Sequence, residues 1–100
     1  GGLQVMGMDN ERHDIQPIPD AFIVNIGDLM ERWTNDAWRS TLHRVVNPPV
    51  NTGSESRRMS VAYFHTPNYE TQVTCSKYSP ITAGAHHKEK INRNNSVRNI

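Results

Sequence analysis

Short apolar runs separated by polar, turn-forming residues recur along the chain, which is the pattern of short β-strands. The segment 3–7 (LQVMG) places Leu3 and Val5 on one face of a strand. The segment 21–27 (AFIVNIG) is almost continuously apolar, which is typical of a strand buried on both faces. Further strands are predicted over 14–19, 38–46, 58–64 and 71–75. We therefore predict a mostly β fold, a sandwich or barrel of short strands.

Two segments carry the features of helices. Over 28–35 (DLMERWTN), Asp28 can cap the first turn and Glu31 follows three residues later, as in a capping box. The buried side of this short helix would be supplied by Leu29, Met30 and Trp33. A turn and a weak helix are predicted over 81–94, near the end of the chain. The segment 47–56 is rich in Pro, Gly and Ser and is predicted to be a loop.

The predicted strands indicate which side chains pack in a core. Six apolar residues are interpreted as packing residues: Phe22, Val24, Ile26, Leu42, Val61 and Tyr63. Leu3 and Phe64 have two interpretations, core packing or the wall of a substrate pocket. Trp33 and Trp38 are interpreted as packing residues as well.

Charge and cysteine content narrow the classes of function. The net charge is +1, from 11 basic and 10 acidic residues, which gives no electrostatic basis for binding nucleic acid or an anionic membrane. Cys75 is the single cysteine, so a disulfide within the chain is excluded and a reducing, cytoplasmic compartment is expected. No apolar run approaches the roughly 20 residues of a membrane span, and the start does not resemble a signal peptide. The chain begins GGLQV, without Met, so we expect a fragment of a longer polypeptide.

One histidine lies within a predicted strand among apolar neighbours. His43 shares a strand face with Thr41 and Val45. It is either a structural histidine, in the core with its ring satisfied by a neighbour or half-exposed, or a metal ligand, since neutral imidazole suits iron, zinc and copper.

The next long strand carries an arginine and a hydroxyl two residues apart. Arg58 and Ser60 leave such a strand on one face, whereas Arg57 is predicted on the opposite face, in solvent. A guanidinium binds a carboxylate through two parallel hydrogen bonds, and a hydroxyl adds a further donor. The alternative is a surface arginine in a loose ion pair. Together with His43, the pair suggests a metal enzyme with an organic acid as co-substrate.

Four blocks of the chain resemble the iron(II)/2-oxoglutarate dioxygenases, in the isopenicillin N synthase-like branch, and they occur in the order of that family. The blocks are GLQV (2–5), PIPDAFIVNIGDLMERWTND (17–36), STLHRVVNP (40–48) and RMSVAYFHTPNY (58–69). The resemblance implies that 1–100 is a single partial domain, the C-terminal half of a double-stranded β-helix (a jelly-roll, cupin-like fold), with one short internal helix and a C-terminal helix.

The resemblance also implies the cofactors and the residues that hold them. His43 corresponds to the second, C-terminal histidine of the iron(II) site, and Arg58 and Ser60 to the pair that binds the distal carboxylate of 2-oxoglutarate. The implied reaction couples oxidative decarboxylation of 2-oxoglutarate, with molecular oxygen, to oxidation of a small-molecule substrate.

The chain departs from this family at the other two iron ligands. They come from a His-x-Asp motif shortly before GLQV, and this chain starts at GGLQV. His13 and Asp14 cannot replace it, because adjacent residues on a strand face opposite ways. The other histidines, His65, His86 and His87, are interpreted as surface residues.

Three interpretations therefore stay open. The chain is part of an oxygenase that is active only within its parent, or a truncated jelly-roll module without catalysis. The third is a related oxidase that uses the positions of Arg58 and Ser60 for a substrate carboxylate. For the chain by itself we expect marginal stability and weak iron binding.

Overall fold

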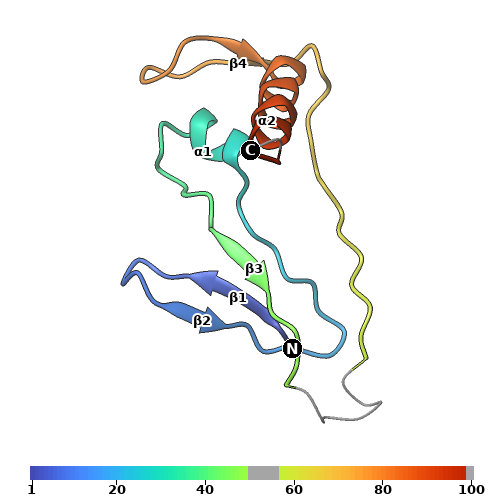
Figure 1. Ribbon diagram of the computed structural model, residues 1–100. Helices are drawn as coiled ribbons and strands as arrows, with labels where there is room; N and C mark the ends of the chain where they lie inside the picture. Colours follow the sequence, from blue (N-terminus) through green and yellow to red (C-terminus); the bar gives the residue numbers. More distant parts are fainter. Residues whose placement is uncertain (50–56, 99–100) are drawn as a thin grey trace. The chain divides into compact units, whose positions relative to one another are not determined.

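The computed structural model describes residues 1–49 and 57–98, with the side chains of residues 97 and 98 left out. The chain divides into two compact units (Figure 1). Unit 1 combines residues Gly1–Asn25 with Ser40–Tyr63, and unit 2 combines Ile26–Arg39 with Phe64–Ile100. Across the described ranges there are five strands and two helices, an arrangement consistent with part of a mostly β domain.

Unit 1 contains a three-stranded antiparallel sheet with the order β2-β1-β3. The strands are β1 (Leu3–Met6), β2 (Arg12–Asp14) and β3 (His43–Val45). A tight turn joins β1 to β2, in which Gly7 N–H donates to Glu11 O at 2.9 Å. The predictions of strands over 3–7 and within 38–46 are thus confirmed in part. The predicted strand over 14–19 is wrong, because β2 ends at Asp14 and residues 15–19 form no strand.

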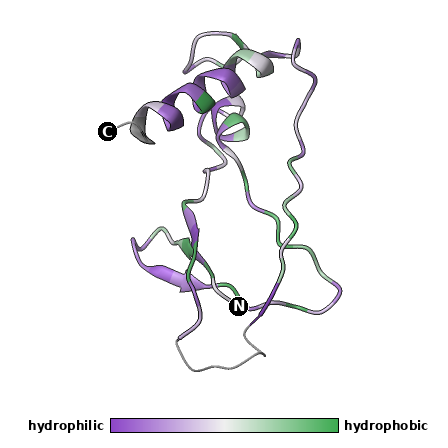
Figure 2. Cartoon of the chain, turned by 45° about the vertical axis from the view of Figure 1, so that its right-hand side comes forward, coloured by the Kyte–Doolittle hydropathy of each residue, from purple (hydrophilic) through white to green (hydrophobic). Residues whose placement is uncertain are grey.

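Two predicted strands are absent from unit 1 as the structure describes it. Residues 21–27 and 58–64 run as extended chain without a strand partner (Figure 1). Both sides of β1 already pair, with β2 and β3, so neither segment can add to it. These stretches carry many of the green, hydrophobic residues of Figure 2.

The predicted core residues on these segments are therefore wrong. Phe22 is 96% exposed and Val61 is 87% exposed, and the exposed residues also include Val24, Leu42, Tyr63 and Phe64. Ile26 and Leu3 are partly covered. An apolar run predicts a buried strand only where a second layer covers it, and the described residues supply no such layer over these segments.

Unit 2 contains two helices and a short strand pair. Helix α1 (Asp28–Trp33) precedes β4 (Gln72–Val73), β5 (Ile81–Thr82) and helix α2 (Ala83–Arg98). The strands pair antiparallel, with Gln72 opposite Thr82. Strand β4 lies inside the predicted 71–75. The weak helix predicted within 81–94 is confirmed, and it extends further to Arg98.

The buried side chains of the described residues lie in unit 2. Val73 and Ala83 are 1% and 5% exposed, respectively. Close packing continues at Gly84, where a Cβ would lie 3.0 Å from the Cβ of Tyr69. Gly84 N–H also donates to Tyr69 O at 3.0 Å. The start of α2 is therefore fixed against the chain before β4.

Helix α1 is confirmed, but its predicted cap is wrong. The cap residue is Gly27, in extended conformation and without a side-chain capping bond, and Asp28 is the first helical residue. Acidic residues in the first turn, Asp28 and Glu31, still interact favourably with the helix dipole. Met30 and Trp33 stay more than one third exposed, so the predicted buried side of α1 is only partly covered.

Some sequence predictions lie beyond these observations. Most of the loop predicted over 47–56 falls on residues 50–56, outside the described residues. Trp38 is 55% exposed, so its interpretation as a packing residue is wrong. Neither helix that the structure describes is long and apolar enough to cross a membrane.

Candidate functional site

His43 is placed on unit 1 by the register of the sheet. It lies opposite Val5 on the neighbouring strand, at the first position of β3, and its side chain is exposed rather than buried. The interpretation as a core histidine is therefore wrong. Its Nδ1 lies 2.9 Å from Thr41 O, and the Asn25 amide nitrogen is 3.4 Å from the same atom.

Two contacts at Nδ1 bear on the tautomer of His43: the Asn25 amide would donate to an unprotonated Nδ1, whereas the shorter contact, with Thr41 O, needs a protonated one. A carbonyl oxygen only accepts, so Nδ1 must carry the proton when it bonds to Thr41 O. In a neutral ring, the lone pair is then on Nε2. A backbone carbonyl that orients the other ring nitrogen is the usual outer support of a metal-binding histidine.

Arg58 and Ser60 line one open pocket of unit 1, with a volume of about 930 Å³. The wall of this pocket also includes Gly2, Gln4, Asp14, Val45 and Val46. Because residues 57–60 are exposed, the guanidinium and the hydroxyl are accessible to a ligand in solution. The pair predicted from the sequence is therefore brought together, although residues 58–64 do not form a strand.

Gly2 allows the Arg58 guanidinium to approach the backbone closely. A Cβ at Gly2 would lie 3.2 Å from Arg58 Nη2 and 2.8 Å from Val46 O. The φ angle of Gly2 is 106°, in a region that other residues rarely adopt. Gly2 O also accepts the N–H of Val46 at 2.8 Å, so the contact holds the end of β3 in place.

A polar chain of three residues crosses the sheet beside this pocket. Arg44 Nε donates to Gln4 Oε1 at 2.9 Å, and Gln4 Nε2 donates to Asp14 Oδ1 at 2.9 Å. The strand register brings these residues together, because Gln4 is opposite both Arg44 and Asp14. Arg44 thus holds the amide of a pocket residue in one orientation.

Arg57 is exposed to solvent, as predicted, but it does not lie apart from Arg58 and Ser60. It lines the same pocket as these two residues. The two-residue alternation used to separate the two arginines applies to a strand, and this segment is irregular. His43 is not among the residues that line this pocket.

The remaining histidines do not line the pocket that contains Arg58 and Ser60. His13 Nε2 lies 2.9 Å from Asp9 Oδ2, while Asp14 accepts from Gln4, so His13 and Asp14 do have separate partners. The pKa of Asp9 is held below its ordinary value, first by the backbone N–H of Glu11 and then by His13. His65 and His87 are exposed, as predicted, whereas His86 is partly covered.

Residues 1–49 and 57–98 do not by themselves fit an iron site. Among them no group of three His, Cys, Asp or Glu side chains is arranged to hold a metal ion. His43 is the candidate ligand within this range, and a facial triad needs two histidines and a carboxylate. The guanidinium of Arg58 and the hydroxyl of Ser60, in contrast, are donors that suit a carboxylate.

Several residues that line the pocket or hold its lining residues in place were missed by sequence reasoning. Gln4, Asp14 and Arg44 belong to strands whose pairing cannot be read from one sequence, although their period of two follows from it. Gly2 had a visible indication, the Gly-Gly pair ahead of a strand, since glycine often marks a close backbone approach.

Comparison with known proteins assigns the family. The family described as the 2OG-Fe(II) oxygenase superfamily matches residues 1–67. No solved structure matches the chain significantly. Three curated relatives illustrate the similarity. Gibberellin 2-beta-dioxygenase 6 of Oryza sativa subsp. japonica is 42% identical over 84 residues, which are 83% of this chain and 22% of that protein.

The other two relatives give the same result. Codeine O-demethylase of Papaver somniferum is 48% identical over 72 residues, which are 72% of this chain and 18% of that protein. Gibberellin 20 oxidase 1 of Arabidopsis thaliana is 47% identical over 73 residues, 73% of this chain and 18% of that protein. The chain therefore spans only about a fifth of the length of these relatives. The chain belongs to the 2OG-Fe(II) oxygenase superfamily.

Proposed function

We propose that residues 1–100 are the C-terminal part of an oxygenase domain with the double-stranded β-helix fold. The three-stranded sheet of unit 1 and the exposed apolar segments beside it support this proposal. In such a fold, further strands would pair with residues 21–27 and 58–64 and cover their apolar side chains.

The proposed activity of the parent protein is that of an oxidoreductase. It couples oxidative decarboxylation of 2-oxoglutarate to the oxidation of a small organic substrate by molecular oxygen, at a non-haem iron(II). The observation that carries this proposal is the shared pocket of Arg58 and Ser60, in a chain whose residues 1–67 match the family. The single cysteine supports a cytoplasmic location.

Each of the three site residues has a proposed role. Arg58 binds the distal carboxylate of 2-oxoglutarate through two charge-assisted hydrogen bonds, and Ser60 donates a further one. His43 holds iron(II) through Nε2, with its ring oriented by Thr41 O. The bound iron and 2-oxoglutarate supply the oxidising chemistry, whereas the protein groups bind and orient them.

A second candidate is a jelly-roll module without catalysis. This candidate needs no iron site in the parent protein. The third candidate keeps the fold but places a substrate carboxylate, rather than 2-oxoglutarate, against Arg58. These candidates differ in the need for iron and in the acid that Arg58 binds.

The test begins with the coding DNA upstream of Gly1. An in-frame His-x-Asp motif shortly before GGLQV supports the enzyme, and a start or stop codon there supports the module. With the motif present, the parent protein should release succinate from 2-oxoglutarate when iron(II) and oxygen are supplied. Substrate oxidation without any succinate would support the third candidate instead.

Two variants of the parent protein distinguish a specific role of Arg58 in binding 2-oxoglutarate from the effect of losing one positive charge. Arg58→Gln should raise the KM for 2-oxoglutarate at least about tenfold, since a charge-assisted pair is lost. Arg39→Gln removes the same charge in unit 2 and should leave that KM unchanged. Equal effects of both substitutions would contradict the proposed binding role of Arg58.

A further inference from the structure

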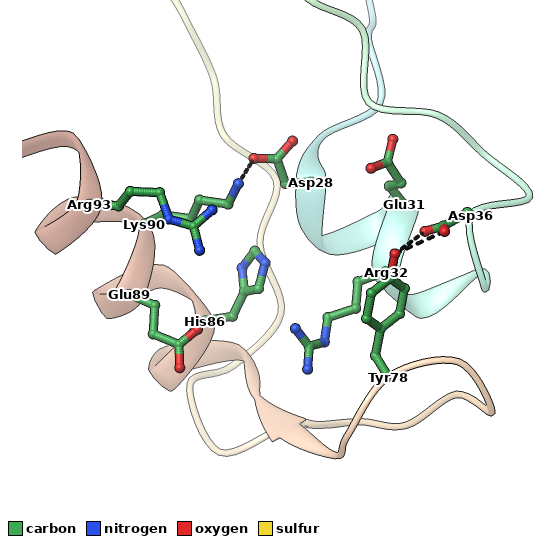
Figure 3. Close-up of a pocket in the computed structure, with 9 residues that line it drawn as sticks. All are labelled: Asp28, Glu31, Arg32, Asp36, Tyr78, His86, Glu89, Lys90 and Arg93. Carbon is green, nitrogen blue, oxygen red and sulfur yellow. Dashed lines mark hydrogen bonds and ion pairs between the residues drawn. The ribbon is translucent and has the colours of Figure 1, made fainter. Parts of the chain in front are cut away.

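Unit 2 contains a pocket of its own, separate from the residues assigned to the oxygenase site. It has a volume of about 300 Å³ and lies between α1, α2 and the chain around Tyr78 (Figure 3). Its wall is almost entirely charged or polar, with both acidic and basic side chains. The question is which of these charges are already compensated.

Two of the acidic residues in this wall are engaged by neighbours. Asp28 forms an ion pair with Lys90 of α2. Asp36 forms an ion pair with Lys77 and accepts from the Tyr78 hydroxyl at 2.8 Å. Because each of these carboxylates already has a cationic partner, they oppose the binding of a further anion only weakly.

Arg32 is held rigidly at the wall of the pocket. Its Nη2 donates to Ser79 O at 2.8 Å, and its guanidinium carbon lies 5.1 Å from the centre of the Tyr78 ring. Within the described part of the chain, Nε is buried and has no hydrogen-bond partner. Because Nε is closed to solvent, a ligand in the pocket would have to bind the guanidinium through its Nη N–H groups.

His86 and Arg93 of α2 contribute to the same wall. In Figure 3, the His86 ring and the Arg32 guanidinium both extend into the space between the two helices, and the Glu89 carboxylate turns away from it. Burial lowers the pKa of His86, followed by the charges of Lys90 and Arg32, which outweigh the opposite effects of Asp28 and Glu89. The wall of the pocket as a whole contains four acidic residues, Asp28, Glu31, Asp36 and Glu89, beside the cations Arg32, Lys90 and Arg93.

We propose that this pocket binds a small oxyanion, a carboxylate or a phosphate group, between Arg32 and His86. The anion would accept from the guanidinium Nη N–H groups of Arg32 and, at lower pH, from the protonated His86, with Arg93 adding positive charge. The site involves none of the residues assigned to iron or 2-oxoglutarate, so it goes beyond the proposed oxygenase function and does not depend on it.

NMR titration of the isotope-labelled chain tests this proposal. Inorganic phosphate and acetate are added separately, and sodium chloride serves as the control at equal ionic strength. We expect either oxyanion to shift the Arg32 Nε–H resonance and to raise the pKa of His86, with no such effect from chloride. A response to phosphate alone identifies a phosphate site, and a response to both identifies a general carboxylate and phosphate site.

Matched variants distinguish a site from general attraction. Arg32→Gln should weaken the binding of the anion at least about tenfold, because charge-assisted hydrogen bonds are lost. Lys88→Gln removes the same charge from an exposed position of α2 and should leave binding unchanged. Arg32→Lys keeps the charge without the planar set of guanidinium donors, and it should also bind the anion more weakly. This variant covers the case in which Arg32→Gln does not fold.

Two results would overturn the proposal. One is the absence of any shift at Arg32 and His86 with both oxyanions. The other is equal weakening by Arg32→Gln and Lys88→Gln, which would mean that the anions respond only to the net charge of the chain.

Discussion

Gly2 determines how closely the Arg58 guanidinium can approach the edge of the sheet. A methyl group there would meet Val46 O at 2.8 Å and Arg58 Nη2 at 3.2 Å, and the φ angle of 106° would be strained. We expect Gly2→Ala to displace Arg58 and to weaken 2-oxoglutarate binding several-fold, measured by NMR titration of the chain. Gly1→Ala is the matched control, since a Cβ at Gly1 would meet nothing within 4 Å.

Asp36 links α1 to the segment before β5 through its carboxylate. Hydrogen bonds from Lys77 and then Tyr78 lower the pKa of Asp36 below its ordinary value of 3.8. The pair therefore stabilises the fold above this pH, and the stabilisation is lost as the pH falls through the lowered pKa. Urea unfolding of Asp36→Asn should show a deficit at neutral pH that disappears in acid.

The same variant should change the titration of Tyr78. The hydrogen bond to Asp36 is the main cause that raises the pKa of Tyr78 above 10.0. In Asp36→Asn this pKa should move back toward 10.0, as followed by the NMR signals of the ring. Asn is the suitable replacement because the residue has a φ angle of 63°, which Asn tolerates. An unchanged Tyr78 titration would contradict the assigned contact.

At the scale of elements, the side chain of Thr82 caps the start of α2. Its residues are mostly polar, and Thr82 Oγ1 accepts the N–H of Ala85 at 3.1 Å near its first turn. Thr82→Ala should lower the free energy of unfolding by about 1 kcal/mol. Thr82→Ser keeps the acceptor and should stay near the wild type, and Thr74→Ala, on an exposed residue, controls for the loss of a threonine. Helix content by circular dichroism and urea unfolding measure the effects.

The elements differ in how far the sequence predicted them. Local sequence features were sufficient to predict α1 and the hairpin strand β1, because both elements depend on residues that are close in sequence. They were insufficient for 21–27, because pairing and coverage of a strand depend on segments distant in sequence. The cap of α1 was misassigned by one residue, since Gly27 takes the extended position although Asp28 has the better side chain.

At the scale of the whole molecule, the sequence predicted which residue types form the site but not how they are arranged in space. Arg58 and Ser60 share a pocket although the predicted strand that would align them is absent, because the pocket is built from Gly2, Val46 and the polar side chains of β1 and β2. A spacing of two residues indicates a shared face only within a strand. The contact of Arg57 with this pocket follows from the irregular backbone.

The sparse burial of the described residues predicts low stability for the chain alone. Val73 and Ala83, both in unit 2, are the buried apolar residues in the described ranges. Because apolar burial is the main stabilising contribution, we expect a low urea midpoint and broad unfolding. Val73→Ala should lower the free energy of unfolding by about 1–3 kcal/mol. A sharp transition at high urea would contradict this prediction.

Iron binding depends on the whole molecule, because one imidazole does not hold iron(II) tightly. His43 is the candidate ligand in the described ranges, which contain no three-residue metal group. We expect the 100-residue chain to bind iron(II) with an affinity weaker than micromolar, measured anaerobically by competition with a chelator. His43→Gln should remove most of the weak binding, whereas His65→Gln, on an exposed residue, should not.

The two outcomes lead to different conclusions about the site. Sub-micromolar affinity that is lost in His43→Gln would mean that residues of this chain complete the coordination sphere. Weak affinity that becomes tight in a parent protein with an upstream His-x-Asp would mean that β3 supplies the last ligand to a site built elsewhere. In that case the hydrogen bond between His43 Nδ1 and Thr41 O orients the ring and leaves the Nε2 lone pair available for the metal.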